Sequence, residues 1–238
     1  MKNIIITLLV IFIIDAAYSQ KIILHRNSGG DQTFQLSSVD SISFLPFACG
    51  DEIRYEGQTY HTVLIGTQCW MKENLNVGTM IQSSSDQLNN SILEKYCYNN
   101  DTSNCSMYGG FYQWDEAMQY VTTVGIRGIC PEGWHIPTQS EFQVLASSVS
   151  GDGNALKRQD QGTGGGLGTN TSGFSALLVG YRYTDASFYA FNDNAFLYSS
   201  SPGSSTEAYY MYLESNTSTI GYYPNNRLYG MNIRCVKD

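Results

Sequence analysis

Basic residues are scarce in this chain of 238 residues, which has 13 Lys and Arg against 21 Asp and Glu and a net charge of −8. The longest basic run is Lys157-Arg158. A nucleic-acid ligand requires a basic stripe, so we expect none. Charged residues make up only 14% of the chain and there are 23 glycines. This composition is typical of a loop-rich, extracellular-type globular protein rather than a disordered one.

Long apolar runs are also rare, and the one clear example lies at the N-terminus. A lysine precedes Ile4–Ile14, and Ala17-Tyr18-Ser19 then places small residues at the −3 and −1 positions of a cut before Gln20. This pattern predicts a signal peptide over residues 1–19, too short to be a transmembrane helix. No later stretch is long enough to span a membrane. The first cysteine is Cys49, so none stands directly after the cut to carry a lipid. We therefore expect a secreted or cell-surface protein without a transmembrane segment.

Cysteines are few, but their number, six, is even. An even count outside the leader favours disulfides in an oxidising compartment. Cys97 and Cys105 enclose a loop rich in Asn and Ser that is typical of a calcium site or of a disulfide-closed turn. Asp101 is its only carboxylate, whereas calcium takes six to eight oxygens, so the turn is favoured. His61 has no second histidine at metal-binding spacing, and we expect neither a metal nor a cofactor.

Residues 20–47 are predicted to form a small β module. Lys21–His25 is β-prone, and the alternating segments Thr33–Leu36 and Val39–Phe44 follow a glycine-rich turn. A hairpin with a third strand is too small to hold a core of its own. The segment is a small module, a pro-segment or an added edge for the domain that we place at residues 48–238, and the sequence does not decide between these.

The central part of the chain predicts a hairpin and two helices. Residues 51–66 have the pattern of two strands around a Glu-Gly turn. Apolar residues recur at helical spacing over Phe111–Val121. Thr138 and Glu141 form a capping box that predicts the start of a second helix, and Gly151 ends it.

One strand near the C-terminus has two different faces. Ala208–Asn216 alternates strictly, which is the pattern of a half-buried strand. Its apolar face has Tyr209, Met211 and Leu213, and its polar face has Tyr210, Tyr212, Glu214 and Asn216. The window Tyr181–Gly230 contains ten of the 18 tyrosines, with many Ser and Asn. Such residues are typical of adaptable binding surfaces, because tyrosine gives a large contact area at low entropic cost.

Three motif regions follow one another along the chain: Ile65–Leu75 (IGTQCWMKENL), then Tyr96–Cys105 with Tyr108–Trp114, and finally Tyr229–Lys237 (YGMNIRCVK). The first and last are similar to the opening motif and the closing strand of the Fibrobacter succinogenes major paralogous domain family, and the middle region resembles that family in the same order. The resemblance covers about residues 50–238.

The resemblance implies a fold and a place for the ligand. Gly133–Phe142 is also similar to a helix start in formylglycine-generating enzymes, which have a C-type-lectin-like fold. We therefore expect an α+β, C-type-lectin-like domain with two helices and mainly antiparallel strands, in which the late loops bind ligand. Some members of this family and fold are variable proteins of diversity-generating retroelements, and Tyr183–Tyr223 has the composition of their diversified segments.

We predict that cysteines of the chain form disulfides and that its tryptophans lie in the core. We predict two disulfides, Cys97–Cys105 and Cys130–Cys235. Cys49 and Cys69 are left as a candidate third pair, and the sequence does not decide whether they are joined. We expect three core tryptophans: Trp70, Trp114 and Trp134. Tyr198 stands where the family has a tryptophan, in the segment Ala195–Ser201.

These observations favour a binding protein over an enzyme. The expected ligand is a protein or glycan on a cell or phage surface, and the predicted binding residues are Tyr183, Asp185, Tyr189, Phe191, Asp193, Tyr210, Tyr212, Glu214, Asn216 and Tyr222. The alternative for these tyrosines is packing against the long loops or the N-terminal module. A structural or adhesive protein without a discrete ligand is a further alternative.

An enzyme of the formylglycine-generating type is the other alternative. It would need free cysteines, and no Ser-His-Asp set or pair of acids stands out. His135 invites a catalytic interpretation, but it lies in a motif that builds a helix start. Calcium-dependent sugar binding is not expected, because Glu-Pro-Asn, Gln-Pro-Asp and Trp-Asn-Asp are all missing.

Overall fold

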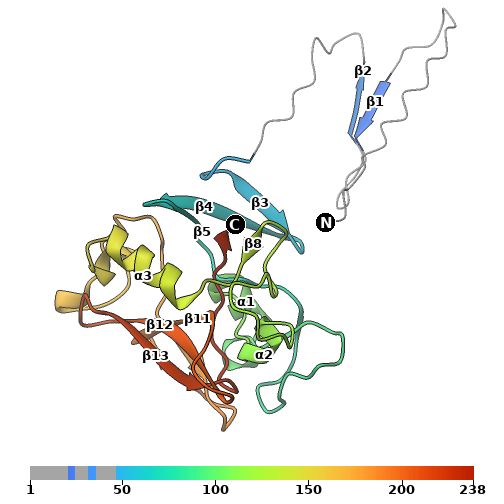
Figure 1. Cartoon of the computed structure of the whole chain (residues 1–238). Coiled ribbons are helices and arrows are strands. Elements are labelled where there is room, and N and C mark those ends of the chain that lie inside the picture. The colour runs from blue at the N-terminus through green and yellow to red at the C-terminus, as the bar shows by residue number, and fades with distance from the viewer. Residues whose placement is uncertain (1–20, 25–31, 36–46) are drawn as a thin grey trace, which may run out of the picture. The chain divides into compact units, whose positions relative to one another are not determined.

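The computed structural model describes residues 21–24, 32–35 and 47–238, and it divides the chain into two units at Pro46 (Figure 1). The described part of the first unit is an antiparallel hairpin in which Lys21 lies opposite Gln35. Its strands are β1 (Lys21–Leu24) and β2 (Gln32–Gln35). The predicted signal peptide and the strand predicted at Val39–Phe44 lie outside the described residues.

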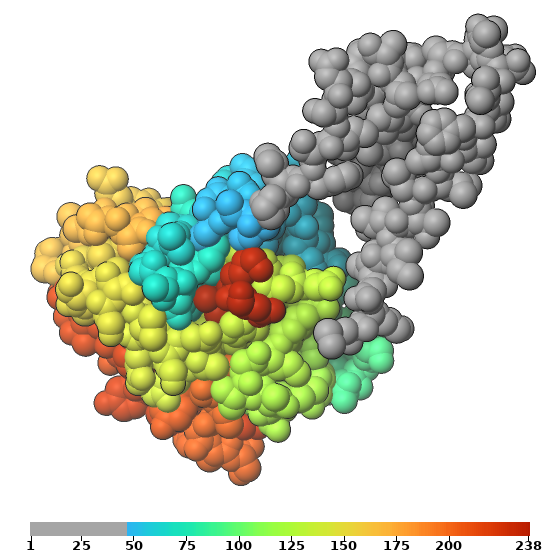
Figure 2. All heavy atoms as spheres, turned by 45° about the horizontal axis from the view of Figure 1, so that its top comes forward, coloured from blue at the N-terminus to red at the C-terminus, as the bar shows by residue number. Residues whose placement is uncertain are grey.

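The second unit begins with a five-stranded sheet in the order β3-β4-β5-β14-β8, with antiparallel neighbours throughout. The strands are β3 (Glu52–Tyr55), β4 (Gln58–Ile65), β5 (Gln68–Met71), β8 (Trp134–His135) and β14 (Val236–Lys237). Glu56 and Gly57 both have positive φ, 48° and 76°, as a two-residue hairpin turn requires. The predicted hairpin is therefore confirmed. The last residues emerge between the early strands and the β8 region in Figure 2.

The late strands form a second sheet, an antiparallel meander in the order β11-β12-β13. Its strands are β11 (Asn194–Pro202), β12 (Glu207–Glu214) and β13 (Ile220–Asn226). Two short pairs complete the described strands: antiparallel β9 (Val179–Arg182) with β10 (Phe188–Phe191), and parallel β6 (Thr79–Met80) with β7 (Glu94–Lys95). The architecture is therefore α+β with mostly antiparallel strands.

The described residues form three α-helices, where the sequence predicted two. They are α1 (Thr102–Tyr108), α2 (Trp114–Ala117) and α3 (Gln139–Ser148). Single 3-10 turns are η2 (Tyr98–Asn100), η3 (Gly153–Ala155) and η4 (Gly164–Gly166). The capping box of α3 is confirmed, since Thr138 Oγ1 accepts from Glu141 N at 3.1 Å and Glu141 Oε2 accepts from Thr138 N at 2.7 Å.

The helix predicted over Phe111–Val121 is wrong in extent, because α2 has only four residues. Phe111 and Tyr112 form β-bridges with Tyr96 and Met231 instead. After α2, Gln119 and Tyr120 adopt positive φ, which ends the helix. The apolar residues of this segment up to Met118 are buried in the core without a continuous helix, whereas Val121 is 41% exposed.

Helix α3 lies between the two sheets (Figure 1). Phe142 and Leu145 on α3 pack with Trp70 of β5 on one side and with Met211 and Leu213 of β12 on the other. A second cluster on the opposite face of the three-stranded sheet contains Trp114, Trp134 and Tyr198. Both faces of that sheet therefore contact apolar core.

The three tryptophans are core residues, as predicted. Trp70 and Trp114 are completely buried, and Trp134 is 4% exposed. Trp114 donates its Nε1–H to the Ser199 carbonyl at 2.7 Å. Tyr198 is also buried, and its hydroxyl bonds with the carbonyls of Asn226 and Tyr229 at 3.1 and 3.0 Å. Tyrosine is accommodated at this position because its polar end is satisfied.

All six cysteines form disulfides: Cys49–Cys69, Cys97–Cys105 and Cys130–Cys235. The second and third confirm the predicted pairs, and the first joins the two cysteines whose pairing the sequence left open. The pairs join, respectively, the approach to β3 with β5, η2 with α1, and the approach to β8 with the last strand. Three disulfides fit an oxidising compartment. Separately, in the part of the chain that the structure describes, no helix has the length and apolarity to cross a membrane.

Candidate binding surface

Eight aromatic side chains form a continuous layer over the β11–β13 sheet and the neighbouring β9–β10 hairpin. The centroids of neighbouring rings lie 4.9–6.4 Å apart, within the range in which aromatic pairs attract. We call this layer the tyrosine surface, and its members are Tyr181, Tyr183, Tyr189, Phe196, Tyr210, Tyr212, Tyr223 and Tyr229.

Strand register brings these rings together. In antiparallel strands, residues directly opposite each other point to the same face. Phe196 lies opposite Tyr212, and Tyr210 lies opposite Tyr223, so side chains from all three strands share one face. Gly221 lies opposite Tyr212, and a Cβ there would come within 2.0 Å of the tyrosine ring. Glycine at this position therefore leaves the space that the ring of Tyr212 occupies.

Exposure is graded across the tyrosine surface. Tyr223 and Tyr189 are 60% and 45% exposed, and Tyr212 is half-buried. Tyr210 is only 8% exposed, which corrects the expectation that it is a surface residue. It lies beside Tyr198, at the end of the sheet face that the Trp114 cluster covers. Tyr209, expected in the core, is half-buried.

Acidic side chains flank the rings. Asp185 accepts hydrogen bonds from the Tyr189 hydroxyl at 2.7 Å and from Ser187 N at 2.8 Å. These bonds hold the pKa of the Asp185 carboxyl below its usual range, and the same contact raises the pKa of Tyr189. Glu214 lies opposite Asn194, at the end of β12. The surface therefore offers aromatic rings with a negative rim.

A buried lysine fixes the loop next to this rim. Lys157 is completely buried, and its ammonium donates to the carbonyls of Glu214 at 2.7 Å, Thr217 at 2.9 Å and Gly166. Burial lowers the pKa of this lysine. The ammonium joins the glycine-rich loop to the end of β12 and to the turn that follows it.

Two predicted binding residues do not belong to the tyrosine surface. Tyr222 lies opposite Met211, on the α3 side of the sheet, and its hydroxyl donates to the Phe142 carbonyl at 3.0 Å. Phe191 stacks on Tyr98 with a centroid distance of 4.5 Å, in a separate aromatic cluster. Near it, Ala190 has a left-handed φ of 58°, which interrupts the alternation of β10.

The other predicted residues fall at or near the surface. Tyr183, Asp185, Tyr189, Tyr210 and Tyr212 are brought together, with Glu214 on the same strand. Asp193 and Asn216 are exposed in the turns that precede β11 and follow β12. Ser215 N donates to the Asp193 carbonyl at 2.7 Å, which links the two turns.

Sequence reasoning missed four members of the surface: Tyr181, Phe196, Tyr223 and Tyr229. Phe196 had a usable signal, because it alternates with Tyr198 along its strand. Tyr223 required the register between β12 and β13, which a single sequence does not contain. Tyr181 and Tyr229 lie inside or beside the family motifs, where we assigned residues to structure.

His135 serves the start of α3 in this structure. Its Nε2 lies 2.8 Å from Glu141 Oε1, and its Nδ1 lies 2.7 Å from Asp238 Oδ1. Burial disfavours the charged imidazole, but the hydrogen bonds to the two carboxylates outweigh it and raise the pKa of His135. Burial also opposes the charged form of Glu141, but its bonds to His135 and Thr138 lower its pKa.

This contact predicts a pH-dependent stability. The contribution of His135 is complete below its unfolded pKa of 6.5 and is lost as pH rises through its higher folded pKa. The contribution of Glu141 is present above its unfolded pKa of 4.5 and is lost as pH falls through its folded pKa. We expect the wild type to lose roughly 1 kcal/mol more than His135→Gln between about pH 6 and pH 9 in urea unfolding. Equal losses would contradict the assignment.

One known family matches most of the second unit of the chain. Residues 63–237 match the model of the Fibrobacter succinogenes major domain. The chain belongs to this family. The match contains the whole tyrosine surface and α3, while Cys49 and its strand neighbour β3 lie before it. Neither the search of curated proteins nor the search of solved structures found a match for the chain.

Proposed function

We propose that this member of the Fibrobacter succinogenes major domain family is a secreted or surface-displayed protein whose tyrosine surface binds a protein on a cell or phage surface. The observation that carries the proposal is the layer of eight packed rings, seven of them tyrosines, over the β11–β13 sheet and the β9–β10 hairpin. Binding energy in protein interfaces concentrates in a few aromatic and arginine residues.

The preorganisation of the rings supports this function. Each ring contacts at least one other, Asp185 holds the Tyr189 hydroxyl, and Lys157 fixes the end of β12. Ordering a side chain on binding costs about 0.5–1.5 kcal/mol, so rings that are already packed lose less on association. All six cysteines are paired, which leaves no thiol for chemistry of the formylglycine-generating type.

The proposal includes a C-type-lectin-like fold, in which late loops and strands hold the ligand. The order of elements fits, with early strands, helices and then the β9–β13 region that bears the tyrosine surface. The composition of Tyr183–Tyr223 fits diversification by a retroelement. A reverse-transcriptase gene beside a near-copy of this coding segment would support that part, and a genomic neighbourhood without them would remove it.

The function is tested by replacing exposed rings. Tyr212→Ser with Tyr223→Ser should reduce retention on cells or phage that hold the wild type at least about tenfold, since it removes two of the aromatic contact groups. Stability should fall by less than about 1.5 kcal/mol, because surface changes usually cost about 0.5 kcal/mol each and Tyr212 is half-buried. Tyr209→Ser is the matched control, because it lies on the other face of the same strand.

Three outcomes are informative. Loss of retention in the double variant alone supports the tyrosine surface. Retention that resists protease treatment of the cells and appears instead on a glycan array would make the ligand a glycan. Undiminished retention in the double variant, or equal loss in Tyr209→Ser, would refute the proposed surface.

A further inference from the structure

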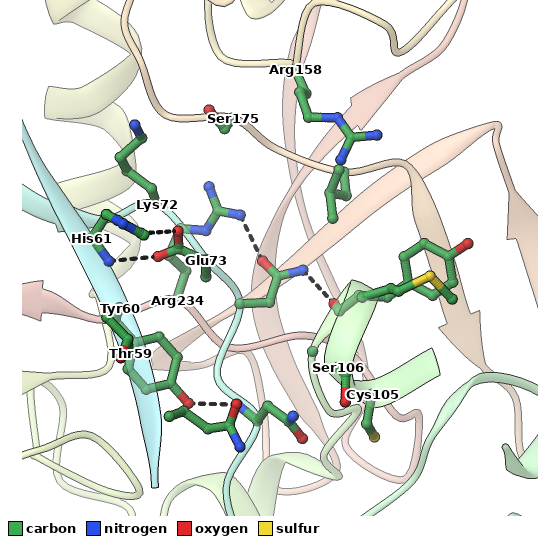
Figure 3. A pocket seen from close by; sticks show the side chains of 17 residues that line it. Thr59, Tyr60, His61, Lys72, Glu73, Cys105, Ser106, Arg158, Ser175 and Arg234 are labelled. Atoms are coloured by element: carbon green, nitrogen blue, oxygen red, sulfur yellow. Dashed lines mark hydrogen bonds and ion pairs between the residues drawn. The ribbon is translucent and has the colours of Figure 1, made fainter. Parts of the chain in front are cut away.

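A cavity of about 420 Å³ lies between β4, the segment after β5, α1 and two loops (Figure 3). It shares no lining residue with the tyrosine surface. Its volume is within the range of small-molecule sites, and a sugar or a small organic acid fits the lower part of that range. Among its lining groups are the hydroxyls of Thr59, Ser106 and Ser175, which suit a polar ligand.

The walls of this cavity are held in place before any ligand arrives. The Cys97–Cys105 disulfide tethers α1, and the Asn74 amide donates to the Tyr108 carbonyl at 3.0 Å. Gly109 has a φ of 82°, and a Cβ there would lie 2.5 Å from the Cβ of Asn74. Glycine therefore permits the end of α1 to approach Asn74. A preformed cavity binds without a large ordering cost.

The charge of the cavity is opposite to that of the protein. Lys72, Arg158 and Arg234 line it, although the chain has a net charge of −8. The one lining carboxylate, Glu73, is already engaged, because His61 contacts Oε1 through Nδ1 and Oε2 through its backbone N–H, each at 2.8 Å. Figure 3 shows this pair on the β4 side, with Arg158 and Ser175 across the cavity.

Two of the three cations have no acidic partner among the described residues. Lys72 makes no side-chain hydrogen bond or ion pair there, whereas Arg158 is paired with Asp160, outside the cavity lining, at 2.5 Å. Arg234 is 1% exposed, and no carboxylate of the described chain lies within 4.0 Å of it. Lys72 and Arg234 are therefore the two cations beside the cavity that have no ion-pair partner among the described residues.

The surroundings of Arg234 leave its charge only partly compensated. Its guanidinium donates to Asn74 Oδ1 at 2.8 Å and to the Phe174 carbonyl, and it lies 4.3 Å above the Phe174 ring. Its Nε–H has no acceptor. Burial lowers the pKa of this arginine to about 9. The charge of Glu73 favours the charged guanidinium, but Glu73 is bonded to His61 and makes no ion pair with Arg234. A buried charge without a counter-ion in contact is costly, and an anion in the adjacent cavity would offset that cost.

We propose that this cavity binds a small carboxylate-bearing ligand of monosaccharide size, that is, a sugar acid. In this proposal, Lys72 contacts the ligand carboxylate directly. The buried Arg234 adds positive electrostatic potential from the wall of the cavity. The hydroxyl and amide groups of the walls bind the sugar hydroxyls. Phosphate shares the anionic chemistry, and the experiment separates it from the sugar acid.

The test is calorimetric titration of the full chain with galacturonate, galactose and inorganic phosphate. Galacturonate should bind and neutral galactose should not. Lys72→Gln should weaken galacturonate binding about tenfold, equivalent to about 1.4 kcal/mol. Arg54→Gln is the charge-matched control, because Arg54 is exposed on β3 outside the cavity, and it should change the affinity less than twofold.

The other outcomes decide against the proposal or refine it. Competition between phosphate and galacturonate supports a shared anion site at Lys72. Binding of phosphate alone, equal binding of galactose, or no galacturonate binding by the wild type would overturn the sugar-acid site. Tyr212→Ser with Tyr223→Ser should bind galacturonate normally, so this proposal and the tyrosine surface can fail independently.

Discussion

Replacing Cys130 and Cys235 with serine should lower the free energy of unfolding by about 4–5 kcal/mol, because this disulfide closes a loop of roughly a hundred residues in the unfolded chain. The two cysteines are 105 positions apart, and both are completely buried. The bridge also connects the approach to β8 with β14, two neighbours in the five-stranded sheet. Urea unfolding of the oxidised protein measures the loss.

The Cys97–Cys105 pair is the matched control for this prediction. It closes a separation of only eight positions. The same loop-entropy relation gives about 2–3 kcal/mol for its removal, so the long bridge should matter more. An equal loss for both pairs, or a larger loss for the short pair, would contradict the loop-length argument.

Trp114→Ala should destabilise the second unit by about 3–5 kcal/mol, the cost usual for removing a large buried aromatic side chain. The indole is completely buried, and its Nε1–H satisfies the Ser199 carbonyl. The guanidinium of Arg227 lies 4.0 Å from the ring centroid on one face. Alanine would leave a cavity, would remove the donor to the Ser199 carbonyl and would remove the aromatic ring beneath Arg227. Thermal and urea unfolding measure the effect.

Val144→Ala provides the comparison for the tryptophan. Val144 lies on α3 and is 44% exposed, so its truncation should change stability by about 0.5 kcal/mol or less. If Trp114→Ala had an effect as small as that, the core assignment of the motif around Trp114 would be wrong.

Local signals in the sequence predicted a large part of this fold. The Glu-Gly turn and the capping box at Thr138 depend on chemistry within a few residues. The even cysteine count indicates disulfides without any knowledge of the fold. The family resemblance supplied the order of the motifs, and the match over residues 63–237 confirms it. These features required no knowledge of which strands become neighbours.

The candidate surface was only partly predictable, because it depends on long-range contacts. Alternation correctly placed Tyr210 and Tyr212 on one face of β12. It did not show that the Trp114 cluster covers the part of that face where Tyr210 lies. The position of Tyr222 on the α3 side follows from its pairing with Met211, and this register is a property of the folded sheet. The left-handed Ala190 likewise has no clear sequence signal.

The most direct test of the tyrosine surface is hydroxyl-radical footprinting of the chain, alone and retained on a cell or phage preparation. We expect Tyr223 and Tyr189, the most exposed rings of the surface, to lose reactivity on binding. The half-buried Tyr212 should show a smaller loss. The exposed Met107, which lines the separate cavity, should react as before. Unchanged reactivity at Tyr189 and Tyr223 in the bound protein would contradict the central claim.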